Sequence, residues 1–179
     1  MDLSLLIAGI LQLILSLVIG LAFIYAGFRF FHKRIKDIDE ISELKKNNIA
    51  VAILNGSIIL SLVIMVKNAI EPAITTFTLT LRNPDSSLTS FLQTAAIMLI
   101  QIIVAGVLAF LAIYIALNLY TFLTRDLDEI DEIKKNNIAV SIVLGVVIIS
   151  ISLLMQQGIK SILDALIPFP AISLKDIGM

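Results

Sequence analysis

The sequence contains no cysteine, no tryptophan and only one histidine, His32. Without cysteine, the chain cannot form disulfides, use a thiol nucleophile or bind metal through thiolates. His32 lies in a basic cluster and has no second ligand residue at metal-binding spacing, so a solvated position at the membrane surface is the favoured interpretation. We therefore expect no metal, no cofactor and no catalytic residue, and we predict that the protein is not an enzyme.

Charged residues are absent from four long apolar segments, at residues 3–28, 47–66, 86–124 and 136–159. Each segment is long enough to cross a hydrocarbon core of about 30 Å, which takes about 20 helical residues. The chain is 59% hydrophobic and 15% charged, with a mean hydropathy of +1.03. These values predict an all-α integral membrane protein with four transmembrane helices. No basic face supports nucleic-acid binding, and no carboxylate lies at mid-membrane to support a proton relay.

One short stretch occurs twice. Residues 39–51 read DEISELKKNNIAV and residues 128–140 read DEIDEIKKNNIAV, so eleven of thirteen positions are identical at an offset of 89. We call these stretches box 1 and box 2. Each box follows one apolar segment and leads into another, which predicts two tandem helical hairpins. Because both hairpins would insert the same way round, we expect parallel repeats with a pseudo-twofold axis along the membrane normal.

The repeat also predicts how the chain is divided. Residues 1–70 form the first two-helix repeat, 71–90 an extracytoplasmic loop, 91–159 the second repeat and 160–179 an extracytoplasmic tail. An acid between Asp37 and Glu40 is expected to cap a helix that runs through box 1 into the membrane without a break. Pro72 favours an end to the second span near Asn68. The alternation of threonine with phenylalanine or leucine at 74–85, followed by a turn signal, predicts a short extended segment on the membrane surface. The third span is expected at about 87–122, and the fourth is expected to end near Gly158.

Basic residues indicate the orientation. The links between spans 1 and 2 and between spans 3 and 4 hold nine of the thirteen lysines and arginines. The positive-inside rule places both links in the cytoplasm. Both termini are then extracytoplasmic, in a multi-pass protein of the cell membrane.

The paired asparagines of the boxes are the main candidate site. Their amides must find partners at the membrane edge, either in a polar ring at a cytoplasmic mouth or, as we favour, in hydrogen bonds that fix helix packing. Two glutamines occupy matching positions on spans 1 and 3 and have the same two interpretations. The candidate residues are Asn47, Asn48, Asn136, Asn137, Gln12 and Gln101.

Paired lysines precede the asparagines in both boxes. They are candidates for contact with anionic lipid or with a cytoplasmic protein partner, although positive-inside anchoring is the favoured interpretation. These residues are Lys45, Lys46, Lys134 and Lys135. Small residues form stripes on span 1, around Gly20, and on span 3, around Ala109, and we expect these stripes to face other helices in a homo-oligomer.

The KKNNIAV box, the two-helix unit and the duplication resemble the YjfL-like family of prokaryotic inner-membrane proteins, also known as domain of unknown function 350. The resemblance covers about residues 3–159. It implies a multi-spanning inner-membrane protein without an assigned activity, in a family associated with membrane-maintenance gene neighbourhoods. It adds no catalytic residue.

Two functions are consistent with these observations. The first is a non-enzymatic, oligomeric membrane scaffold or partner-binding subunit, in contact with membrane lipid. The second is a small channel or transporter for an ion or polar solute, lined by the amides together with Asn55 and Ser61.

Overall fold

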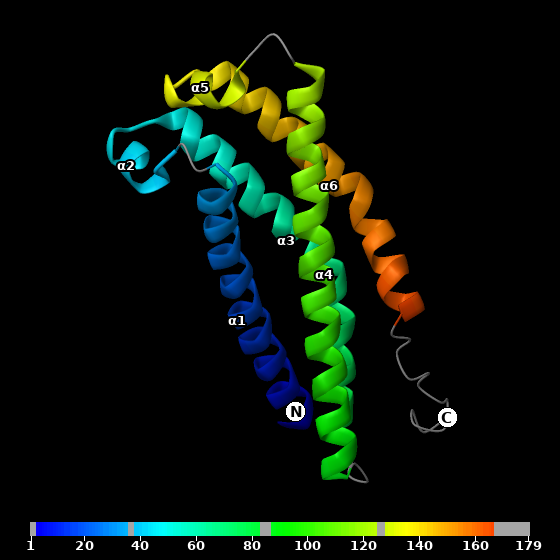
Figure 1. The fold of residues 1–179 in the computed structure, drawn as a ribbon. Coiled ribbons are helices and arrows are strands. Elements are labelled where there is room, and N and C mark those ends of the chain that lie inside the picture. Colours follow the sequence, from blue (N-terminus) through cyan, green and yellow to red (C-terminus); the bar gives the residue numbers. More distant parts are fainter. Residues whose placement is uncertain (1–2, 36–37, 83–86, 125–127, 167–179) are drawn as a thin grey trace.

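The computed structural model describes residues 3–35, 38–82, 87–124 and 128–166. The helices in these ranges are α1 (Leu3–Arg34), α2 (Glu40–Lys45), α3 (Ile49–Arg82), α4 (Leu88–Leu123), α5 (Glu129–Lys134) and α6 (Ile138–Leu166) (Figure 1). Helices α1, α3, α4 and α6 are each long and apolar enough to cross a membrane. The predicted all-α class with four membrane-length helices is confirmed.

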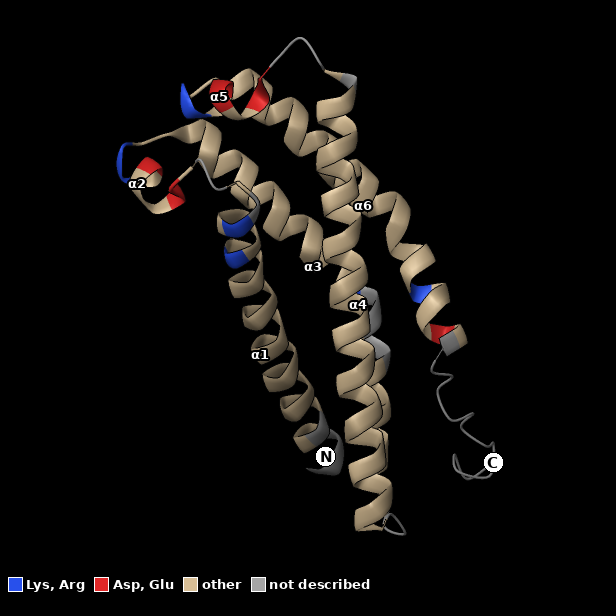
Figure 2. Cartoon of the chain, viewed as in Figure 1, with Lys and Arg blue, Asp and Glu red and all other residues tan. Residues whose placement is uncertain are grey.

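Helix α3 is the central helix of the bundle. It packs along α1, α4 and α6, and α4 also packs along α6. Helices α1 and α6 share no comparable packing and lie on opposite sides of α3 and α4 (Figure 1). The short helices α2 and α5 lie together at one end of the bundle, and the starts of α1 and α4 lie at the other. Most of the described charged residues gather around α2, α5 and the adjoining end of α1 (Figure 2).

The stripe of small residues on α4 faces the interior of the chain. Ala105, Ala109, Ala112 and Ala116 are spaced three or four residues apart, and each is at most 1% exposed. Their short side chains let the backbone of α4 approach the neighbouring helices closely. Replacing Ala109 by leucine would therefore disturb the fold of one chain, which makes it a poor probe of assembly. Gly20 on α1 differs, because a Cβ added there meets no atom within 4 Å.

The predicted end of the second span is wrong, and so is the predicted extended segment at 74–85 as far as residue 82, beyond which its last residues lie outside the described part of the chain. Helix α3 continues through Pro72 to Arg82. Proline removes one helical hydrogen bond and costs roughly 3 kcal/mol inside a helix. Beyond it, however, Ala73, Ile74 and Phe77 are buried in a cluster with Met98 of α4. This packing makes the helical path favourable in spite of the proline. The end of α3 and the start of α4 therefore occupy much of the expected loop at 71–90.

The fourth span also extends further than expected. Helix α6 passes Gly158 and ends at Leu166, because Ile159 and Leu163 beyond the glycine are buried in the main core. The expected tail therefore begins as helix, and its residues 167–179 lie outside the described part of the chain. The third span was predicted well, since Ser87 caps α4 by accepting a hydrogen bond from the Ser90 amide at 3.1 Å.

Candidate functional site

The two boxes have the same local structure, and it is not the continuous helix that the sequence predicted. In each box a six-residue helix begins after an aspartate, Asp39 or Asp128. The Asp39 carboxylate accepts from the Ser42 amide at 3.3 Å, and Asp128 accepts from the Asp131 amide at 3.1 Å. The short helix then ends, and a long helix, α3 or α6, begins after a tight turn. Among the acids from Asp37 to Glu40, the residue that caps the helix is thus Asp39. Asp37 lies outside the described residues.

The first asparagine of each pair makes this turn. Asn47 and Asn136 have φ values of 60° and 63°, in the left-handed region that asparagine adopts more readily than most residues. The backbone amide of Asn47 donates to the Leu44 carbonyl, and the backbone amide of Asn48 donates to the Glu43 carbonyl, both at 3.0 Å. This pair of bonds is the Schellman arrangement that closes a helix at its carboxyl end. Box 2 repeats both bonds.

The second asparagine of each pair begins the next helix. The Asn48 side-chain oxygen accepts from the Val51 amide at 3.1 Å, and the Asn137 oxygen accepts from the Val140 amide at 3.4 Å. Both are N-caps, which satisfy one of the free amides in the first helical turn. The Asn-Asn dipeptide is therefore a stop signal followed by a start signal.

A glutamate in each box ties the turn together. The Glu43 carboxylate accepts from the side-chain amide of Asn48 at 3.0 Å and from the Lys46 ammonium at 2.7 Å. Lys46 and, to a smaller extent, Asn48 lower the pKa of Glu43. Glu132 accepts from Asn137 at 2.8 Å, which is the main cause of its lowered pKa. Both carboxylates therefore stay ionised at neutral pH.

The two boxes also touch each other directly. The Asn48 amide group donates to the carbonyls of Ile133 and Lys134, at 3.1 and 3.2 Å. In the same contact, the Asn136 side-chain oxygen of box 2 accepts from the Ala50 backbone amide of box 1 at 3.0 Å. These bonds join residues 85 or 86 positions apart. They fasten the start of α3 to the turn between α5 and α6.

A second acidic position links each box to the long helix before it. Glu40 and Glu129 are equivalent in the repeat, and both are buried, at 5% and 4% exposure. Glu40 is paired with His32 of α1 at 3.2 Å, and Glu129 accepts a hydrogen bond from Thr124 at the end of α4. Neither glutamate was predicted as a site residue from the sequence, where Glu40 was considered only as a helix-capping acid. Their recurrence in both boxes was the available signal, but it did not reveal their burial.

The candidate lysines divide into two kinds. All four are exposed. Lys46 is paired with Glu43, and Lys135 is paired with Asp131 at 2.6 Å and with Glu132 at 3.2 Å. Lys45 and Lys134 make no ion pair with any residue that the structure describes. The first lysine of each pair is thus the one available to an external group.

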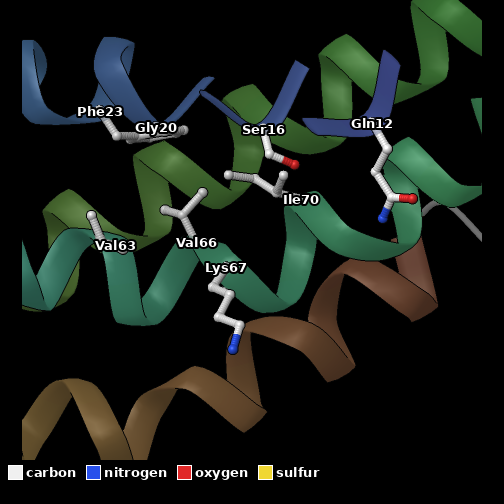
Figure 3. A pocket seen from close by; sticks show the side chains of 8 residues that line it. All are labelled: Gln12, Ser16, Gly20, Phe23, Val63, Val66, Lys67 and Ile70. Carbon is white, nitrogen blue, oxygen red and sulfur yellow. The ribbon is translucent and has the colours of Figure 1, made fainter. Parts of the chain in front are cut away.

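The candidate amides do not form one ring. Within the described ranges no hydrogen bond joins one of the four box asparagines to another through their side chains. Gln101 is 1% exposed in the interior of the bundle. Gln12 and Ser16 of α1 line a cavity of about 380 Å³ against α3. Figure 3 shows Lys67 among the lining residues, with its ammonium group pointing away from α1.

These features define a multi-pass helical membrane protein built on two copies of one box. The chain belongs to the family described as Domain of Unknown Function (DUF350), whose profile matches residues 4–156 and 90–174. The two overlapping matches are consistent with tandem copies. No curated protein and no solved structure matches the chain. The family description assigns no activity.

Proposed function

We propose that this protein is a non-enzymatic membrane scaffold that self-associates and holds partner subunits in membrane maintenance. The observation that carries the proposal is how the box amides are used. Asn48 and Asn136 are hydrogen-bonded to backbone groups of the other box, and Asn137 to its own box. Such bonds give rigidity and specific packing, which a scaffold needs.

A channel or transporter is the second candidate, and the cavity between α1 and α3 favours it. Gln12 and Ser16 give this cavity a polar edge. Against it, the other polar residues expected to line a path are packed inside the bundle, with Asn55 at 3%, Ser61 at 0% and Gln101 at 1% exposure. The rest of the lining is mostly apolar, apart from Lys67. We therefore rank conduction second.

Flux measurements distinguish the two functions. We expect proteoliposomes with the native chain to pass Na⁺, K⁺, Cl⁻ and glycerol no faster than protein-free liposomes. Light scattering of the same detergent-solubilised preparation should give a mass of more than one chain. If the native chain supported flux and Gln12→Leu abolished it, the scaffold proposal would be wrong and the protein would be a channel or transporter. Gln93→Leu is the matched control, because Gln93 is exposed on α4 and does not line the cavity.

We further propose that the box end of the bundle faces the cytoplasm, because most lysines and arginines gather there. Since the native chain lacks cysteine, single cysteines can report the side directly. We expect a membrane-impermeant maleimide to label Ser87→Cys in intact cells. Lys45→Cys should be labelled only after permeabilisation. If Lys45→Cys were labelled in intact cells and Ser87→Cys only after permeabilisation, the box end of the bundle would face outward.

A further inference from the structure

The contact between the boxes is one-directional, because each box contributes a different set of atoms. Box 1 supplies donors, the Asn48 amide group and the Ala50 backbone amide. Box 2 supplies acceptors, the carbonyls of Ile133 and Lys134 and the side-chain oxygen of Asn136. We call these sets the donor face and the acceptor face of a box.

Each box carries both faces, because the two sequences are nearly identical. Box 1 has an acceptor face at Leu44, Lys45 and Asn47, and box 2 has a donor face at Asn137 and Ala139. Within the described residues neither of these faces is hydrogen-bonded to the other box. One half of each box is therefore used, and the other half remains open.

Burial shows the same asymmetry independently of the hydrogen bonds. On the donor faces, Ala50 of box 1 is 0% exposed, whereas the equivalent Ala139 of box 2 is exposed. On the acceptor faces, Ile133 of box 2 is 0% exposed, whereas the equivalent Leu44 of box 1 is 39% exposed. A residue that is buried in one repeat is thus open in the other.

The long helices follow the same pattern. Helix α4 of the second repeat packs along α3 of the first. Under a twofold relation α1 would pack along α6 in the same way, but these two helices share no comparable contact. The packing therefore departs from the pseudo-twofold arrangement expected from the sequence. A contact of this kind is heterologous: the surface used on one unit differs from the surface used on the next.

We propose that copies of this chain associate by repeating the contact between the boxes. The donor face of box 2 in one copy binds the acceptor face of box 1 in the next copy, and α1 of that next copy packs along α6. This proposal rests on the self-association proposed above and specifies its geometry. The occupant of each open face is a second copy, because that face repeats an interface already formed within the chain.

The membrane makes this association planar. Both boxes lie at the same end of the bundle, so successive repeats stand the same way up (Figure 1). The operation that relates them is then a rotation about the membrane normal. Repeating a heterologous contact by such a rotation gives a ring when the angle closes. Each chain contributes one open donor face and one open acceptor face, so rings of more than two chains are allowed.

Cysteine cross-linking in native membranes tests this geometry, since the chain has no cysteine of its own. The variant Asn47→Cys/Ala139→Cys places one thiol on each open face. We expect an added oxidant to produce a ladder of dimers, trimers and larger species. Mixing the two single-cysteine variants should give dimers and nothing larger. Leu44→Cys/Ala139→Cys is a second pair that leaves the turn at Asn47 unchanged.

The equivalent pair inside one chain is the matched control. Ala50→Cys/Asn136→Cys should form an intrachain disulfide and no ladder, because these residues already meet at the contact between the boxes. If this control forms while both open-face pairs stay monomeric, the head-to-tail geometry is wrong, although self-association can stand. Disulfide-linked dimers of one single-cysteine variant would also contradict the head-to-tail geometry, because they would indicate a symmetric dimer. A native mass of one chain would overturn both proposals.

Discussion

Replacing Asn48 by leucine should lower the stability of the native chain substantially. The substitution removes the N-cap of α3, worth about 1 kcal/mol. It also leaves the carbonyls of Ile133 and Lys134 without the Asn48 donor, in a site where Asn48 is 4% exposed. A buried polar group that loses its partner costs about 1–3 kcal/mol, so we expect a total loss of about 2–4 kcal/mol.

The equivalent change in box 2 separates these two contributions. Asn137→Leu also removes an N-cap and a bond to a glutamate, but it breaks no contact between the two boxes of one chain. We expect Asn48→Leu to unfold at a lower temperature than Asn137→Leu, by roughly 2–10 °C for a chain of this size. Circular dichroism in one detergent measures both midpoints. Equal midpoints would show that the contact between the boxes contributes no stability.

The Asn-Asn dipeptide shows how much of the site the sequence could predict. Its duplication and its position just before an apolar segment were evident, and the expectation that its amides bond to other groups is confirmed. The break in the helix was not predicted, because lysines and apolar residues on both sides favour helix. Asparagine at a left-handed turn is less common than glycine, and here Asn47 and Asn136 take that position.

The helix ends show a different limit. Pro72 and Gly158 are local stop signals, and both were overridden by burial of residues beyond them. Those residues are buried by packing against other helices, as Phe77 is against Phe91 of α4, with ring centroids 5.1 Å apart. Local propensity cannot reveal such contacts, whereas the four apolar segments are set by length and composition and were predicted correctly.

The asymmetry between the repeats could not be predicted from the sequence. Ala50 and Ala139 occupy the same position in nearly identical boxes, so any pattern-based argument gives them the same environment. Their burial differs because one box has a neighbour on its donor face and the other does not. Tertiary placement alone distinguishes them.

Gly145 of α6 should tolerate no side chain, because α3 approaches it closely. A Cβ added at Gly145 would clash with the Ser57 oxygen and would lie 3.2 Å from the Ser57 Cβ. Ser57 cannot turn away without losing its bond to the Ile53 carbonyl at 2.8 Å. We expect Gly145→Ala to destabilise the chain by about 1–3 kcal/mol, since overpacking exceeds the gain in helix propensity of about 1 kcal/mol.

Two variants make this expectation specific to the contact between α3 and α6. Gly158→Ala lies on the same helix, where an added Cβ meets no atom within 4 Å, so it should unfold at the native temperature or slightly above. Ser57→Ala/Gly145→Ala removes the oxygen that makes the shortest contact and should recover part of the lost stability. Thermal unfolding of the three variants in one detergent gives the comparison. If Gly145→Ala were as stable as Gly158→Ala, helices α3 and α6 would lie further apart at Gly145 than in this structure.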